Sequence, residues 1–182
     1  IYGAIVCNCW FDGSRAAGAA SAGDADLDHL RVGLNSDDRA FRSLIEGCTF
    51  VACDQDAIAI PAAPYTVVRN CNIIDGDASE LTRYGVNIGS VGCAVTGCFI
   101  SIADTATPGG GVYVNSTRAR VHDNRIWARG ADGICVLVAA SGTVSSSGNY
   151  LTAVAAGNLD DYTTDNTSPS ADANISGVFA AT

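Results

Sequence analysis

The stretch Val95-Thr96-Gly97-Cys98-Phe99-Ile100 contains a six-residue pattern that returns along most of the chain. Its order is an aliphatic residue, two variable positions, Cys or Asn, one further variable position and an apolar residue. The other copies occupy residues 6–11, 45–50, 68–73 and 121–126, with a weaker one at 146–151. Their fourth positions fall at 9, 48, 71, 98, 124 and 149, so four of the five intervals are between 23 and 27 residues. A nearly constant interval of this length indicates one structural unit per repeat, stacked on the next.

A second apolar element lies between successive copies and begins with a small residue. It appears at residues 57–60, 85–88, 111–114 and 133–136, and its apolar positions alternate as in a short strand. In the six-residue pattern the fourth and sixth positions share one strand face, which we expect to point inward. The Gly or Asn at the third position suits a corner in the left-handed conformation. The repeat therefore predicts an all-β fold, a right-handed parallel β-helix (solenoid) of about six coils, with equivalent residues stacked about 4.8 Å apart.

The fourth position of the pattern predicts a ladder of side chains inside the coils. Cys48, Cys71 and Cys98 form its first part, and Asn124 and Asn149 continue it. Because a free cysteine packs as a small apolar side chain, we favour free thiols, although a disulfide between neighbouring coils is sterically allowed. The asparagines are expected to satisfy each other's amide groups. An ordinary β-sandwich is the alternative fold, but it would not return the same chemistry at one position at such an interval.

The organisation expected along the chain is one solenoid domain, residues 1–156, with a loop insertion at 12–28 and a polar C-terminal tail at 157–182. The insertion explains the single long interval, because its Gly, Ala, Ser and Asp content is typical of a loop. The last apolar piece of the tail is expected to cap a coil or to pair with a neighbour. Since the sequence begins at Ile1 and contains no Met, we expect a processed product or the ordered part of a longer protein.

The charge pattern bears on the class of partner. The formal net charge is −9, and all 10 Lys and Arg positions are Arg. Nucleic-acid binding needs clustered cations that displace counterions, so we expect no nucleic-acid partner. No apolar run approaches the ~18 residues of a membrane span, so we expect no membrane insertion. A neutral polysaccharide, a protein, or an anionic sugar bridged by a cation remain open as partners.

The corner V-x-N/G-[CN]-x-F/I followed by G-[VI]-x-[VI] resembles the pectate-lyase-like right-handed parallel β-helix superfamily. The resemblance covers about residues 1 to 155 and concerns the coil architecture. The superfamily includes polysaccharide lyases, polygalacturonase-type hydrolases, epimerases, and the tailspikes and head spikes of bacteriophages. Because one fold hosts many functions, the resemblance alone does not decide among them.

The bacteriophage spike type is the member that we favour. It implies a virion spike or fibre protein on the surface of a virion or phage-like particle, which binds host cell-surface polysaccharide. It also implies a homo-oligomer, a trimer in known spikes, assembled with other virion proteins. The alternatives are a polysaccharide-degrading enzyme, either a lyase or a glycoside hydrolase, and a non-catalytic surface adhesin. A secreted protein is the alternative location.

The candidates for catalysis are carboxylates on neighbouring coils. Asp104 with Asp132 is a pair able to flank a glycosidic bond, and Arg129 lies near Asp132 in the sequence. Acid–base work needs paired groups in a cleft, and the N-T-D, G-H-G and R-I-K segments of polygalacturonase-like hydrolases are absent. We therefore favour a protein that is not an enzyme, with no cofactor and no metal site. The resemblance also implies, for a pectate-lyase-like site, a carboxylate cluster that holds calcium and an Arg that abstracts a proton. The nearest candidates are Asp75, Asp77, Glu80 and Arg83 on one loop, and Asp123, Arg125, Arg129 and Asp132 on another.

The candidate substrate-binding residues are aromatic. Trp127, Tyr113 and Tyr84 are expected to be exposed and to stack on sugar rings, as are Trp10 and Tyr150. The alternative for each of them is packing between coils or against a neighbouring chain.

Overall fold

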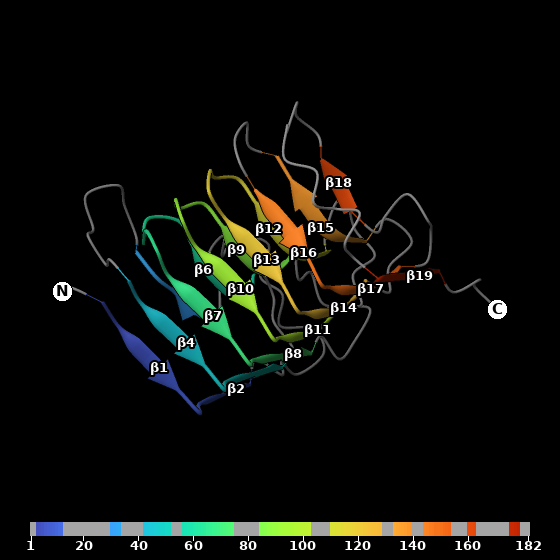
Figure 1. The fold of residues 1–182 in the computed structure, drawn as a ribbon. Helices are drawn as coiled ribbons and strands as arrows, with labels where there is room; N and C mark the ends of the chain where they lie inside the picture. The colour runs from blue at the N-terminus through green and yellow to red at the C-terminus, as the bar shows by residue number, and fades with distance from the viewer. Residues whose placement is uncertain are drawn as a thin grey trace, which may run out of the picture.

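The computed structural model describes residues 3–12, 30–33, 42–51, 56–74, 84–102, 110–128, 133–139 and 144–153, and the backbone of 160–162 and 175–178. Within these ranges every regular element is a β-strand, and the strands form three sheets around one core (Figure 1). All strand pairs are parallel, and each strand pairs with its equivalent in the next repeat. None of the described residues forms a helix long and apolar enough to span a membrane.

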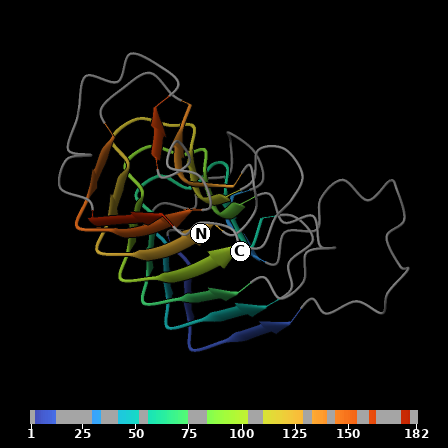
Figure 2. The same cartoon turned by 90° about the vertical axis from the view of Figure 1, so that its right-hand side faces the viewer.

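The chain passes through the three sheets in turn and then returns to the first, one strand further along the stack. The first sheet contains β1 (Ile5–Cys7), β4 (Leu44–Glu46), β7 (Val67–Arg69), β10 (Ala94–Thr96), β13 (Arg120–His122) and β16 (Ser145–Ser147). The second contains β2 (Trp10–Asp12), β5 (Thr49–Val51), β8 (Asn72–Ile74), β11 (Phe99–Ile102), β14 (Arg125–Ala128), β17 (Tyr150–Ala153) and β19 (Ile175–Val178). The third contains β3 (Leu30–Arg31), β6 (Ile58–Ile60), β9 (Tyr84–Ile88), β12 (Gly110–Val114), β15 (Ile134–Val138) and β18 (Asp160–Tyr162). The predicted all-β parallel β-helix is confirmed, and the turned view shows its strands stacked from blue to red (Figure 2).

The corner between the first and second sheets has one residue in the left-handed conformation in each repeat, as the third position of the pattern predicts. The φ angles are 54° at Asn8, 63° at Gly47, 54° at Asn70, 64° at Gly97, 59° at Asp123 and 66° at Gly148. Glycine and a residue with a short polar side chain alternate along this row. A Cβ added to each of these glycines would lie 2.5 Å from the Oδ1 of the Asn or Asp in the preceding coil. Glycine is therefore required at every second corner by its neighbour as well as by its own φ.

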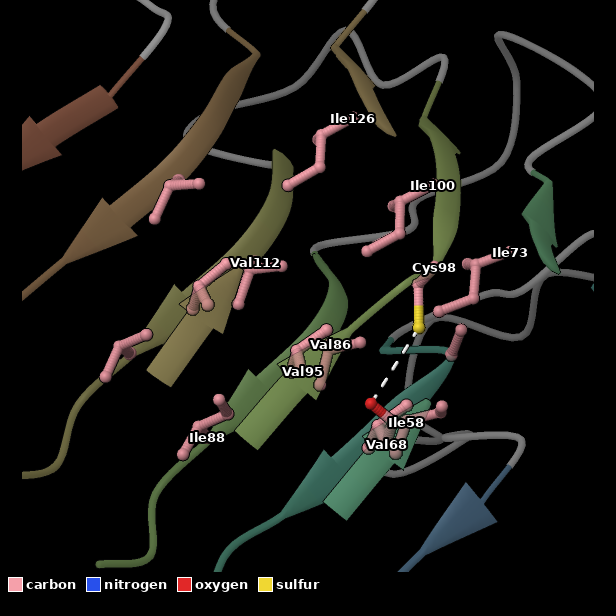
Figure 3. Packing of buried hydrophobic residues seen from close by; sticks show 14 of the residues in the cluster. Ile58, Val68, Ile73, Val86, Ile88, Val95, Cys98, Ile100, Val112 and Ile126 are labelled. Carbon is pink, nitrogen blue, oxygen red and sulfur yellow. Dashed lines mark hydrogen bonds between the residues drawn. The ribbon is translucent and has the colours of Figure 1, made fainter. Parts of the chain in front are cut away.

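The core is built from rows of aliphatic side chains that point inward from all three sheets. Val68, Ile73 and Val86 belong to one coil, and all three are fully buried. The row of Ile73, Ile100 and Ile126 continues along the second sheet (Figure 3). The small residue near the start of β9 has a steric reason. A Cβ on Gly85 would lie 2.6 Å from the side chain of Ile100, so that position has little room for a larger residue.

The ladder at the fourth position is buried as predicted. Cys48, Cys71 and Cys98 are at most 2% exposed, as are Asn124 and Asn149. Each cysteine thiol donates to the carbonyl two residues before it, and the Cys98 thiol also reaches the carbonyl oxygen of Val68 (Figure 3). The seven described cysteines are free, as expected, and Cys53 lies outside the described residues.

The asparagines of the ladder bond to each other and to the backbone. The Asn149 Oδ1 accepts from both the Nδ2 and the backbone N–H of Asn124, at 2.9 and 3.0 Å. The Asn124 Oδ1 accepts from the N–H of Cys98 at 2.9 Å. The Nδ2 groups of Asn124 and Asn149 also donate to carbonyls of the preceding coil, at Val95 and Val121, and that of Asn149 donates to the Oγ of Ser146. The expected amide pairing is present, and main-chain carbonyls and one hydroxyl complete it.

The segment 157–182 contributes two strands. β19 pairs with β17 at the end of the second sheet, and β18 pairs with β15 in the third sheet. Strands with polar residues can pair here because the edge of a parallel sheet offers main-chain hydrogen-bond donors and acceptors, whatever the side chains. Of the expected insertion at 12–28, only Asp12 is described, as the last residue of β2.

Candidate functional site

The outer face of the second sheet carries the most prominent group of exposed aromatic side chains among the described residues. Because strand side chains alternate, the first and third positions of each strand point away from the core. The first positions form one row in register: Trp10, Thr49, Asn72, Phe99, Arg125 and Tyr150. The third positions form a second row: Asp12, Val51, Ile74, Ser101, Trp127 and Thr152. We call these two rows the outer face.

Several large apolar side chains of the outer face remain in contact with solvent. Trp10 is 69% exposed, Tyr150 43% and Trp127 42%, while Phe99 is half-buried. Single exposed apolar residues are ordinary, and Ile5 and Tyr65 are exposed elsewhere on the molecule. Four aromatic residues on one sheet face are less ordinary, and such a face is typical of a binding surface.

Phe99, Arg125 and Tyr150 form a stack across three neighbouring strands. The Cζ of Arg125 lies 5.8 Å from the centroid of the Phe99 ring and 5.8 Å from that of Tyr150. A guanidinium over aromatic rings is attracted by the negative ring faces, and the rings restrict its motion. The side chain of Arg125 is nevertheless exposed.

Arg125 has no ion-pair partner among the described residues. The other charged residue that the structure describes on the outer face is Asp12, which lies on β2, four strands away from β14. Arg69 on the first sheet is a contrast. Its Nε lies 2.8 Å from the Oε1 of Glu46, and this hydrogen-bonded carboxylate raises the pKa of Arg69.

Trp127 lies two residues after Arg125 on the same strand and therefore on the same side of the sheet. Its register neighbours are Ser101 on β11 and Thr152 on β17, and both are buried. The indole beside these small side chains is 42% exposed. Trp127 and Arg125 thus form an adjacent aromatic and cationic pair.

The other two predicted aromatic residues lie on a different sheet. Tyr113 is on β12 and Tyr84 on β9, and their rings stack with centroids 4.6 Å apart at 14°. Tyr113 is half-buried, but Tyr84 is only 7% exposed, so the expectation that Tyr84 is exposed was wrong. The stacked ring of the next coil helps to cover it. The structure therefore separates Trp127 from the Tyr84–Tyr113 pair.

Asp56 is a buried carboxylate that the sequence reasoning missed. Its Oδ1 accepts from the backbone N–H of Tyr84 at 3.1 Å, and its Oδ2 accepts from the Nδ2 of Asn87 at 2.6 Å. Asp56 is 7% exposed. These bonds tie the start of β9 to the preceding coil. The feature of the sequence that could have indicated it is the position of Asp56 just before the wholly apolar strand β6.

The catalytic candidates Asp104, Asp132 and Arg129 lie outside the described residues. In the sequence, Asp104 falls between β11 and β12, and the other two fall between β14 and β15. Asp75, Asp77, Glu80 and Arg83 also lie outside the described part. Within the described part, no group of three His, Cys, Asp or Glu side chains is placed to hold a metal ion.

Asp123 is separated from the outer face because it occupies the corner before β14. Its Oδ2 lies 2.8 Å from the Nδ1 of His122, which is also 3.3 Å from the Oγ1 of Thr96. Asp123 and Arg125, considered together from the sequence, therefore face different surroundings.

Residues 3–168 match the family model described as "Right handed beta helix region". No curated protein and no solved structure matches the chain. The match spans most of the sequence and agrees with the three parallel sheets described above.

Proposed function

The chain belongs to the right-handed β-helix family, and we propose that it binds polysaccharide along the outer face of the second sheet. In this proposal it is the binding part of a virion spike or fibre, on the surface of a virion or phage-like particle. It forms a homotrimer, assembles with other virion proteins and recognises host cell-surface polysaccharide.

The observation that carries the binding proposal is the row of exposed aromatic residues. From Phe99 on β11 to Tyr150 on β17 is two strand steps, about 10 Å at about 4.8 Å a step. From Trp10 on β2 to Tyr150 is five steps, about 24 Å. An extended polymer lying along the stack can therefore contact several of these rings. Aromatic side chains present a large apolar surface with restricted motion, which suits the apolar faces of sugar rings.

The position of these residues on strands supports the same proposal. Each belongs to a parallel sheet whose inward side chains pack in the core, where Ile100 and Ile126 are fully buried. Groups held by a packed scaffold lose little freedom on binding, so more of the contact energy appears as affinity. A face that extends across several neighbouring strands fits an extended polymer better than a small enclosed molecule.

The test is a titration of the full chain with a panel of bacterial capsular polysaccharides, followed by calorimetry. We expect Trp127→Ala to weaken binding about 2- to 12-fold, because an aromatic contact contributes about 0.5–1.5 kcal/mol. Tyr113→Ala, on the third sheet, is the matched control and should leave the affinity unchanged. Binding that is the same in Trp127→Ala and Tyr150→Ala as in the unaltered chain would contradict the proposal.

Two further readouts separate the parts of the proposal. Light scattering should give the mass of a trimer, and a stable monomer would contradict trimeric assembly. The polysaccharide should keep its length on prolonged incubation, which size-exclusion chromatography measures. Shortened chains would instead indicate a polysaccharide-degrading enzyme.

A further inference from the structure

We propose that Arg125, between the rings of Phe99 and Tyr150, binds the carboxylate of an acidic sugar unit, with Trp127 stacking on the adjoining sugar ring. This inference rests on the proposed polysaccharide binding and specifies the class of polysaccharide: one that contains uronic-acid-type residues.

The two flanking rings hold the guanidinium in an orientation that suits binding of a carboxylate. Phe99 and Tyr150 lie on the two strands flanking β14, and the Cζ of Arg125 is 5.8 Å from the centroid of each ring. Aromatic contact over the guanidinium leaves its in-plane N–H groups as the groups available for hydrogen bonds. Those N–H groups match the two oxygens of a carboxylate, which arginine binds in a bidentate manner.

The charge around Arg125 is unbalanced. It is exposed and has no ion pair among the described residues, although the chain as a whole has a formal charge of −9. A neutral sugar would not require a cation at the centre of an aromatic row. A densely charged polyanion would be repelled by the acidic chain, so widely spaced carboxylates fit better.

Trp127 gives the site its second contact. Two residues along a strand span about 7 Å, so Trp127 lies close enough to Arg125 for both to contact neighbouring units of one polymer. The arrangement offers a charge-assisted bond beside an apolar platform. A small number of polar groups that fix orientation, beside apolar contact area, is typical of ligand sites.

A purely structural role for the stack makes a different prediction. If Arg125 only joined three strands, its loss would change stability and would not change the choice between acidic and neutral sugars. Arg120 is the matched control, because it is an exposed arginine of the same coil that lies on the first sheet.

The experiment titrates the full chain with oligosaccharides of glucuronate- and galacturonate-containing polysaccharides, and with the same oligosaccharides after reduction of the carboxylates to alcohols. We expect the unaltered chain to bind the acidic form about 10- to 100-fold more tightly. Arg125→Gln should abolish this preference while retaining affinity for the reduced form. Arg125→Lys, which keeps the charge and loses the planar fork, should retain part of it, and Arg120→Gln all of it.

The outcomes separate this inference from the proposed function. Equal loss of acidic and reduced sugars in Arg125→Gln, or no preference in the unaltered chain, would overturn the carboxylate site. If neutral capsular polysaccharides still bound in a manner dependent on Trp127, the proposed function would stand without it. If no polysaccharide bound at all, both would fall.

Discussion

Asn70 and Gly97 occupy the same corner of successive coils, and the Oδ1 of Asn70 lies 2.5 Å from where a Cβ on Gly97 would be. Asn70 has a φ of 54° and Gly97 a φ of 64°, so both residues are in the left-handed region. The side chain of one corner therefore limits the residue at the next. This coupling gives a prediction that local backbone preference alone does not.

Gly97→Ala should lower the free energy of unfolding by about 2 kcal/mol or more, measured by urea denaturation. About 1–2 kcal/mol comes from placing a Cβ in the left-handed conformation, and the contact with Asn70 adds to it. In the double variant with Asn70→Gly, the contact is gone and only the backbone cost remains. Strictly additive effects of the two substitutions would contradict the steric coupling.

Asn149→Ala should destabilise the protein by about 2–4 kcal/mol. It leaves the N–H of Asn124 without its acceptor and creates a small cavity, and each buried unpaired group costs about 1–3 kcal/mol. Cys71→Ala, in the same ladder, is the control and should cost less, because a thiol forms weaker hydrogen bonds. Equal stability losses in the two variants would show that the contribution of a ladder side chain depends on its volume alone, and would contradict the prediction.

Stability should fall as the pH rises from about 9 to about 11. Burial raises the pKa of Cys93 to about 11 in the folded chain, from an ordinary value of 9.0. Between these values the unfolded chain releases the thiol proton and the folded chain keeps it, so rising pH favours unfolding. Chemical denaturation at a series of pH values measures the slope, and Cys93→Ala should reduce it.

The coupled thiols of Cys71 and Cys98 contribute to this pH dependence with opposite signs. The hydrogen bond between them and burial raise the pKa of Cys71, and the same hydrogen bond lowers the pKa of Cys98. Cys93→Ala should therefore remove most of the slope that the thiols cause. A slope that does not change in Cys93→Ala would show that this thiol is not protected as the structure indicates.

Tyr113→Ala should destabilise the protein by about 1–2 kcal/mol, because it removes a stacked aromatic pair and uncovers the ring of Tyr84. Thermal unfolding measures the loss, and tyrosine fluorescence reports the changed surroundings of Tyr84. Tyr65→Ala, at an exposed corner, gives a comparison in which no aromatic partner is lost. Similar stability losses in both variants would contradict a stabilising role for the stack.

Features that depend on one repeat could be predicted from the sequence. The corner required a left-handed residue, and Gly97 satisfies that requirement in its own coil. The ladder position needed only the chemistry of Cys98 or Asn124 and the alternation of a strand. Each repeat predicts the same strand, left-handed corner and second strand, and this agreement among repeats is why the fold could be predicted.

Features that depend on contacts between repeats were harder to predict. Tyr84 was expected to be exposed because its burial depends on the ring of Tyr113, in the following coil. The stack around Arg125 forms only because the strands align Phe99, 26 positions before Arg125, and Tyr150, 25 positions after it, with Arg125. The sequence did contain the information for this stack, because Phe99, Arg125 and Tyr150 each occupy the fifth position of their copy of the six-residue pattern.

The hydrogen-bonded ladder inside the coils determines the geometry of the surface above it. Cys98, Asn124 and Asn149 are joined rung to rung, and each is covalently bonded to the next residue: Phe99, Arg125 and Tyr150. A substitution in the ladder that shifts one rung would therefore change the separation of the aromatic and cationic groups outside. Affinity for a ligand on this face would then respond to residues that the ligand never touches, and the buried asparagines would act as determinants of recognition at a distance.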